Sequence, residues 1–312
     1  MISASLSNRS LLSSGVYTRT WSLARMRLRL RYVVMMFSRM RVRRRSTRPE
    51  VPVEPVSVEP VDGVFEVLDD GMLLCLADDL TYPVRVPARR VLPVGGFLTG
   101  LLSPGPSFWS LTSLTGTFPG YQAAGVANLA LRLLAERPRD AFRNPELVER
   151  GWELQRAERE AFVAYFGTDT LILPPAEAGA RLEAFRGEPC PMPAGARTVG
   201  VIYDDLDGLL VVPELATVRS MFSYPALATD PDHARTLRGY LSDESITPAP
   251  LRRLARTHPE TVDEVFRAVL AHPEFSWSTH GETLLREYKP AYFSQTPHPA
   301  TLVIADRLAA LL

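Results

Sequence analysis

The chain has 312 residues, of which 46% are hydrophobic and 22% charged, the proportions of a soluble globular protein with one large or two modest domains. Its net charge of zero is unevenly distributed, because residues 1–49 contain twelve arginines and no acidic residue. Without these twelve, 23 of the 35 basic residues remain against 35 acidic ones, a formal charge of −12. An acidic body is a poor partner for nucleic acid or an anionic membrane. No apolar run approaches the ~20 residues of a membrane span.

Lysine is almost absent: Lys289 is the only one, and the other 34 basic residues are arginine. A need for cationic surface does not select arginine so completely, so we attribute the bias to a GC-rich, bacterial genome. The two cysteines, Cys75 and Cys190, are too few for a disulfide framework or a zinc site. We therefore expect a cytoplasmic protein.

Residues 1–48 are predicted to be either a disordered basic arm or sequence translated from DNA upstream of the true start codon. Arginines alternate with apolar residues over 25–31, a period of two that does not suit the amphipathic helix of a mitochondrial presequence. The apolar run 32–37 is too short for a secretory signal. If the arm is genuine, its arginines could neutralise phosphates of a nucleic acid. Residues 49–62, rich in Pro, Val and Glu, predict an extended linker.

The next part of the chain favours β structure. Two apolar runs, 64–68 and 72–76, flank an Asp-Asp-Gly turn and predict a hairpin. Further short strands are expected at 82–86, 90–94, 97–102 and 108–117. Together they predict a small antiparallel sheet or partial barrel of about five strands.

Helices are predicted to dominate the remainder, with the clearest signals in the middle of the chain. A helix over 121–136 precedes a long one that Asn144 and Pro145 should open and Gly167 should end. Gln155 and Arg159 interrupt its otherwise apolar stripe. A short strand at 171–173, a helix over 174–185 and a Pro- and Gly-rich loop follow.

The C-terminal part begins with a second predicted hairpin over 198–215, which turns at Asp204, Asp205, Asp207 and Gly208. Prolines then punctuate five short predicted helices, which start near residues 230, 247, 258, 279 and 300. The fold class is therefore α+β, with a small antiparallel β region packed with a helical middle segment and an α-rich C-terminal part. We place the divisions at 63–187, a β region followed by helices, and at 198–312, a hairpin with a helical C-terminal domain.

Motifs that specify chemistry are missing from the sequence. It has no phosphate-binding loop, dinucleotide fingerprint, His-Glu-x-x-His or Gly-x-Ser-x-Gly, so we predict no cofactor. Asp204, Asp205 and Asp207 offer oxygen ligands for a divalent ion, but Asp and Gly are also what a hairpin turn requires. We therefore read these carboxylates first as a turn. The five histidines lie in the last 80 residues, and none forms an i, i+3 or i, i+4 pair.

The stretch 275–293 has the most distinctive composition. A single retained lysine, Lys289, could be a chemically required amine, with His280 as an acid–base partner. Aromatic side chains beside arginine are typical of binding surfaces, and the expected binding residues are Trp277, Arg286, Tyr288, Tyr292 and Phe293.

Three functions follow from these observations. The preferred hypothesis is a non-catalytic protein-interaction or regulatory module that binds a protein partner through its C-terminal surface. The second is an enzyme that uses Lys289 with His280 or with the 204–207 carboxylates. The third is a nucleic-acid-associated protein that depends on residues 1–48.

Overall fold

The first half of the fold is a closed five-stranded barrel. The computed structural model describes residues 59–69, 71–86 and 92–312. The barrel strands are β1 (Val61–Asp69), β2 (Met72–Cys75), β3 (Thr81–Arg85), β4 (Phe97–Ser103) and β5 (Trp109–Phe118), arranged in the order β1-β2-β3-β5-β4. The expected hairpin and five strands are thus confirmed, with two corrections. The barrel is closed rather than partial, and β3 pairs with β5 in parallel, so the sheet is mixed.

Two boundaries in this region also differ from the sequence-based expectation. Residues 61 and 62 belong to β1 and not to the linker, and residues 59 and 60 precede it outside any strand. The remainder of the predicted linker, 49–58, and the arm 1–48 lie outside the described residues. The strand expected at 90–94 is wrong where it can be judged, because Leu92 and Pro93 lie outside any strand. Pro93 has no N–H to donate to a ladder, while Leu92 is buried in the barrel core.

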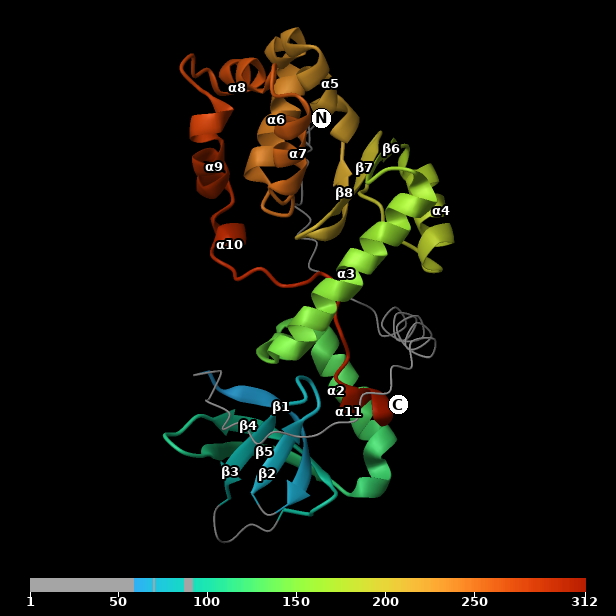
Figure 1. Ribbon diagram of the computed structural model, residues 1–312, viewed down its shortest axis with the longest axis vertical. Helices are drawn as coiled ribbons and strands as arrows, with labels where there is room; N and C mark the ends of the chain where they lie inside the picture. The colour runs from blue at the N-terminus through green and yellow to red at the C-terminus, as the bar shows by residue number, and fades with distance from the viewer. Residues whose placement is uncertain (1–58, 70, 87–91) are drawn as a thin grey trace, which may run out of the picture.

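Two helices connect the barrel to the rest of the molecule (Figure 1). After a 3-10 turn (η1, Gly120–Gln122), α2 (Ala123–Glu136) buries Val126, Leu131 and Leu134 against the barrel. A second 3-10 segment, η2 (Pro138–Arg143), leads into α3 (Pro145–Phe166). The predicted ends of α3 are confirmed: the Asn144 side chain accepts from the backbone N–H of Glu146, and Gly167 takes φ 74°.

A three-stranded antiparallel sheet forms the centre of the second half. It consists of β6 (Thr170–Leu173), β7 (Val199–Asp204) and β8 (Gly208–Pro213), and α4 (Pro175–Arg186) follows β6. Because side chains alternate along a strand, Val201 and Tyr203 pack with Phe162 of α3, whereas Ile202 faces the C-terminal helices.

The C-terminal part is helical, as expected, but its boundaries are partly different. Its elements are α5 (Leu215–Ser223), η3 (Pro225–Thr229), α6 (Pro231–Ser242), α7 (Ala249–Thr257), α8 (Val262–Leu270), α9 (Trp277–Tyr288), α10 (Pro290–Phe293) and α11 (Asp306–Ala310). The sequence pattern did not identify α5. The helix expected over 300–312 is wrong except for α11, because residues 294–305 form an irregular tail between α10 and α11.

This tail carries the chain back to the barrel, across the predicted boundary between 187 and 198. Arg307 of α11 forms a bidentate ion pair with Glu66 of β1, with N–O distances of 2.5 and 2.6 Å. Val303 and Leu308 are buried in the same core cluster as α2. In Figure 1 the C-terminus accordingly lies beside α2, while α3 runs diagonally between the barrel and the second sheet.

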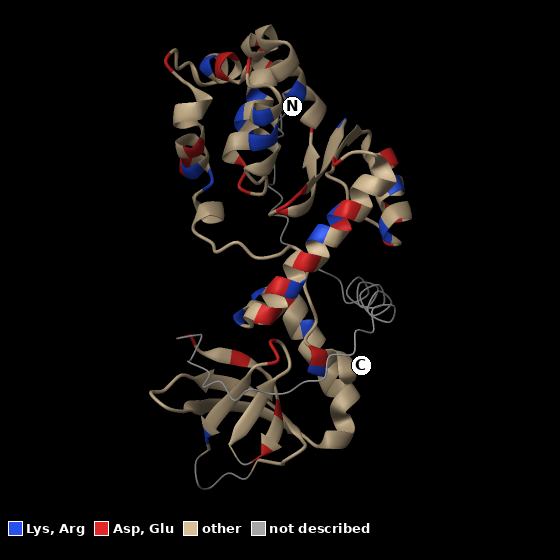
Figure 2. Cartoon of the chain, viewed as in Figure 1, with Lys and Arg blue, Asp and Glu red and all other residues tan. Residues whose placement is uncertain are grey.

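Figure 2 shows acidic and basic residues along the exposed face of α3 and few of them on the barrel. Within the part of the chain that the structure describes, no helix has the length and apolar character required to span a bilayer.

Candidate functional site

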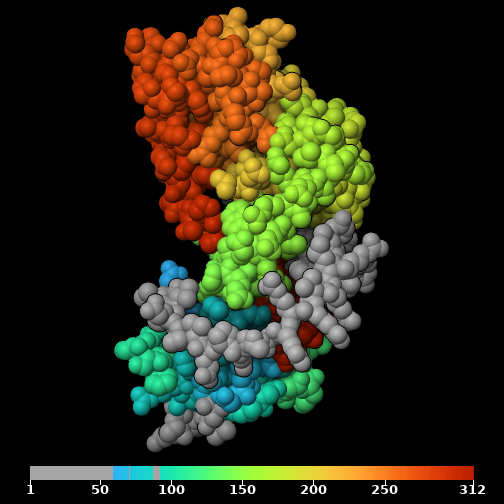
Figure 3. All heavy atoms as spheres, viewed as in Figure 1, coloured from blue at the N-terminus to red at the C-terminus, as the bar shows by residue number. Residues whose placement is uncertain are grey.

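The tail borders an open cavity of about 570 Å³ where the barrel side of the molecule meets the C-terminal helices. One wall comes from α2 and η2, the opposite wall from the β7–β8 turn, α7, α9 and α10, and the floor from residues 295–304. In the space-filling view the molecule has a waist between these two parts (Figure 3). The volume lies within the range of ~300–1,000 Å³ that is typical of small-molecule sites, and such sites favour boundaries of this kind.

One end of the cavity is polar and centres on Asp207. The hydroxyl of Tyr292 donates to Asp207 Oδ1 at 3.1 Å. Asp207 Oδ2 and Thr247 Oγ1 are both shielded from water, and the Thr247 hydroxyl lies close enough to the carboxyl to hydrogen-bond with it. Burial, followed by repulsion from Asp204, raises the pKa of Asp207, while the Thr247 and Tyr292 hydroxyls and Arg252 act in the opposite direction.

Two arginines lie beside this polar end. The guanidinium carbons of Arg252 and Arg286 are 5.4 and 4.6 Å from the centre of the Phe293 ring. Arg252 donates from Nε and Nη2 to Glu282, both at 2.7 Å, and these bonds lower the pKa of Glu282. Arg286 is exposed and forms no ion pair with any residue that the structure describes. Its charge helps to lower the pKa of the nearby Glu282, while its guanidinium remains exposed to solvent.

The other end of the cavity carries a histidine. His298 stacks on Phe142, with ring centres 4.5 Å apart and planes 16° apart. Burial, together with the nearby Arg139 cation, lowers the pKa of His298, so the imidazole is neutral at neutral pH. Its Nδ1 is shielded and forms no hydrogen bond with the described chain. Arg139 donates to the side-chain oxygen of Gln295 at 2.6 Å.

The two residues that interrupt the apolar stripe of α3 hold the cavity together. Gln155 is buried; its Nε2 donates to the Asp205 carbonyl at 2.7 Å, and its Oε1 accepts from the Ala300 N–H at 2.7 Å. It thus joins the β7–β8 turn to the tail. Gly208, at φ 68° in that turn, also lies against the tail, since a Cβ there would be 2.7 Å from the Cβ of Ala300.

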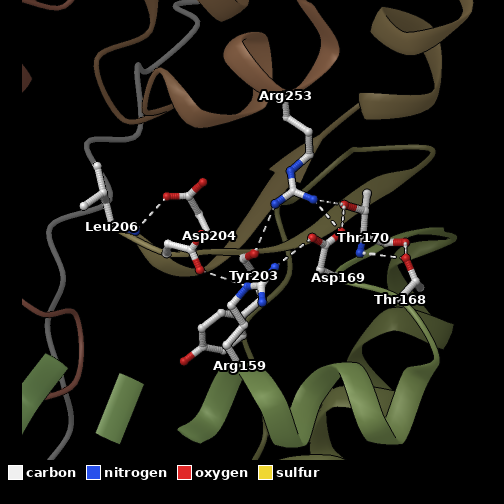
Figure 4. Close-up of polar contacts among 9 residues, drawn as sticks. Arg159, Thr168, Asp169, Thr170, Tyr203, Asp204, Leu206 and Arg253 are labelled. Atoms are coloured by element: carbon white, nitrogen blue, oxygen red, sulfur yellow. Dashed lines mark hydrogen bonds and ion pairs between the residues drawn. The ribbon is translucent and has the colours of Figure 1, made fainter. Parts of the chain in front are cut away.

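Arg159, the second interruption, belongs to a polar network that holds α7 on the sheet (Figure 4). Arg159 and Arg253 both contact Asp169, at 3.3 and 2.5 Å. Arg253 also donates to the Tyr203 carbonyl at 3.3 Å, and its bonds lower the pKa of the Asp169 carboxyl. Because Arg252 adjoins Arg253 in α7, this network fixes the helix that brings Arg252 to the cavity.

Comparison with protein-family models, curated proteins and solved structures finds no match to this chain. The site must therefore be judged from its own residues. Arg286, Tyr292 and Phe293, expected on a binding surface, line the cavity together with Asp207. The other two expected binding residues lie elsewhere: Trp277 is half-buried against Phe266, 4.8 Å between ring centres, and Tyr288 is exposed.

The structure does not bring Lys289 and His280 together. Lys289 is buried, and its ammonium donates to the Asp243 carbonyl at the C-terminal end of α6, where a cation is favourable. Burial lowers its pKa to about 8. His280 is exposed, and its Nδ1 accepts from the Ser276 N–H at 3.0 Å. Nine residues along α9 correspond to about 13 Å.

The three carboxylates of the β7–β8 turn likewise have separate partners. Asp204 Oδ1 accepts from the backbone N–H groups of Leu206 and Asp207, at 2.9 and 3.1 Å, as turn chemistry requires. Asp205 pairs with Arg159 at 3.0 Å, and Asp207 faces Tyr292. No group of three potential metal ligands occurs among the described residues.

Five further cavity residues were not predicted as site residues. Arg139 and Phe142 come from η2, Thr247 and Arg252 from the N-terminal side of α7, and His298 from the tail. His298 carried one signal, because it lies between two prolines and so cannot belong to a regular helix. The sequence does not indicate that these segments meet.

Proposed function

We propose that this protein is a non-catalytic regulatory module that binds a small amphipathic molecule in the cavity. The observation that carries the proposal is a single cavity with a largely apolar lining, the Tyr292–Asp207 pair at one end and the exposed guanidinium of Arg286 beside that pair. The guanidinium of Arg286, which forms no ion pair with the described residues, adds a charge for recognition.

The chemistry of the lining residues favours binding over catalysis. The Tyr292–Asp207 contact is the one hydrogen bond between two titratable side chains of the described cavity lining. Burial, and then the Asp207 charge, raises the pKa of Tyr292 to about 12. The phenol therefore keeps its proton at neutral pH and serves as a hydrogen-bond donor rather than as a nucleophile or base.

The test uses 8-anilinonaphthalene-1-sulfonate, an apolar dye with one anionic group, whose fluorescence rises in a dry site. Ala135 lines the cavity from α2, so Ala135→Trp should fill it and weaken dye binding at least 10-fold. Ala124→Trp, at an exposed position of the same helix, is the matched control and should bind as the parent protein does. Equal binding by both variants would place the dye elsewhere and refute the proposal.

A regulatory module must also pass on whether its ligand is bound. We propose that it does so by binding a protein partner. We propose that the exposed Tyr288 and the half-buried Trp277 on α9 contact this partner.

The arginine bias supports a bacterial host, and the scarcity of cysteine supports a cytoplasmic setting. Nucleic-acid binding through residues 1–48 would show a steep salt dependence that is lost when they are removed.

A further inference from the structure

We infer that the cavity binds an anionic amphiphile, a molecule with an apolar body and one carboxylate or phosphate group. The anionic group would lie at the cavity opening, beside the guanidinium groups of Arg139, Arg252 and Arg286, which all line the cavity. This inference rests on the proposed function, since it specifies the charge and the polar group of the ligand that the same cavity takes.

The three arginines come from separate elements and gather on one short stretch, residues 293–295. The guanidinium carbons of Arg252, in α7, and Arg286, in α9, lie 5.4 and 4.6 Å from the centre of the Phe293 ring. From the opposite wall, Nη2 of Arg139 in η2 donates to the side-chain oxygen of Gln295 at 2.6 Å. Three positive charges therefore surround the same part of the cavity lining.

Carboxylates do not balance this charge. Arg252 is paired with Glu282, whereas Arg139 and Arg286 are exposed and form no ion pair with any described residue. Even with Glu282 and Asp207 both ionised, three guanidinium groups face two carboxylates, which leaves positive charge in excess. The chain from residue 50 onward has the opposite balance, with 35 acidic and 23 basic residues. The cavity is thus a positive site in an acidic body, and such a site attracts anions.

Asp207 opposes an anion only weakly, although it is the one acidic side chain of the described lining. Its Oδ1 accepts from the Tyr292 hydroxyl at 3.1 Å, its Oδ2 is shielded from water, and the Thr247 hydroxyl lies within bonding reach of the carboxyl. Burial raises the pKa of Asp207, so a smaller fraction of the carboxyl is charged at any given pH. A cationic ligand would meet three guanidinium groups and only this half-buried carboxyl.

The remainder of the cavity suits an apolar body. Leu134 of α2 and Leu302 and Ile304 of the tail line it, and burial of apolar surface against them stabilises a ligand. Phe293 joins the two regions, because its ring faces the guanidinium groups and also lines the cavity. Arginine binds both carboxylate and phosphate through paired N–H groups, so the geometry fits either anion.

Isothermal titration calorimetry on the full chain tests this with four probes that share one alkyl chain. They are decanoate, decyl phosphate, decan-1-ol and decylamine, each used below the concentration at which it forms micelles. At least one of the two anions should bind roughly 10-fold more tightly than decan-1-ol, and decylamine should bind more weakly than the alcohol. The comparison of decanoate with decyl phosphate identifies the anionic group.

Arginine substitutions should affect only the anionic probes. Arg139→Gln and Arg286→Gln should each weaken binding of the preferred anion roughly 3-fold, and the double variant roughly 10-fold, while decan-1-ol binds as before. Arg132→Gln is the matched control, because Arg132 is also exposed and without an ion pair among the described residues, yet it does not line the cavity. Thermal melting verifies that each variant is folded, and each single variant tests the inference by itself.

The outcomes distinguish this inference from the proposed function. If decan-1-ol or decylamine binds as tightly as both anions, or if the arginine variants bind the anion as the parent does, the inference is overturned while the proposed function stands. The same holds if the anilinonaphthalene dye binds in the cavity and none of the four probes does. If neither the dye nor any probe binds, both fail.

Discussion

Replacing Gly151 by alanine should loosen the C-terminal tail, although alanine is the better helix former. Gly151 lies on the face of α3 against which the tail packs. A Cβ at this position would lie 2.5 Å from Cγ of Pro299 and 3.1 Å from the Thr301 carbonyl oxygen. The proline ring cannot turn away as a flexible side chain would, so the added methyl group must push the tail.

The expected magnitude is the sum of two opposing effects. In an unobstructed helix, Gly to Ala stabilises by about 0.5–1 kcal/mol. Overpacking a close contact costs roughly 1–3 kcal/mol. We therefore expect Gly151→Ala to lie between no change and a loss of about 2.5 kcal/mol. A Cβ added to Gly239, in α6, would meet no neighbouring atom within 4 Å, so Gly239→Ala should stabilise by roughly 1 kcal/mol.

Chemical denaturation of the parent and both variants measures these differences, and dye binding reports on the cavity. The tail residues Pro299 and Ala300 line the cavity, so Gly151→Ala should also weaken binding of the anilinonaphthalene dye, while Gly239→Ala should not. If Gly151→Ala stabilises as much as Gly239→Ala, the tail does not pack on α3 as described.

Three further predictions concern single side chains. Asn144→Ala should cost roughly 2 kcal/mol, because it removes the cap of α3 and a 2.7 Å bond from Nδ2 to the Asp78 carbonyl. Asn144→Asp keeps the cap, so it should cost less in a denaturation experiment; an equal cost would contradict the role of the cap. Because the folded protein holds the proton of Asp207 more tightly than the unfolded chain does, the parent should lose stability relative to Asp207→Asn as pH rises above about 4, the ordinary pKa of an aspartate; melting temperatures that stay parallel above that pH would contradict the raised pKa. An amine-acylating reagent should leave the buried Lys289 unmodified in the native protein and modify it after denaturation, as peptide mass spectrometry can verify; rapid native labelling would contradict its burial.

Local sequence signals predicted the ends of α3 and the two hairpins correctly, because the interactions that form these features involve residues close together in the sequence. Asn144 and Gly167 bound α3 through capping and positive φ, interactions that involve a few neighbouring residues. The two hairpins follow from alternating apolar runs around Gly turns. The tail is different, because it is stabilised by residues far away in the sequence. Arg307 pairs with Glu66, 241 positions earlier, and no local pattern predicts that contact.

The candidate site also combines residues that the sequence indicated with residues that only long-range contacts bring together. Composition singled out five residues as a binding surface, of which Arg286, Tyr292 and Phe293 line the cavity while Trp277 and Tyr288 do not. Gln155 shows what composition cannot provide. Its polar side chain in an apolar stripe looked like an interruption, yet it is the buried amide that joins the β7–β8 turn to the tail. A buried polar residue that breaks a core pattern must find partners, so such an interruption marks a place where distant segments meet. In this chain the cavity lies at that meeting place.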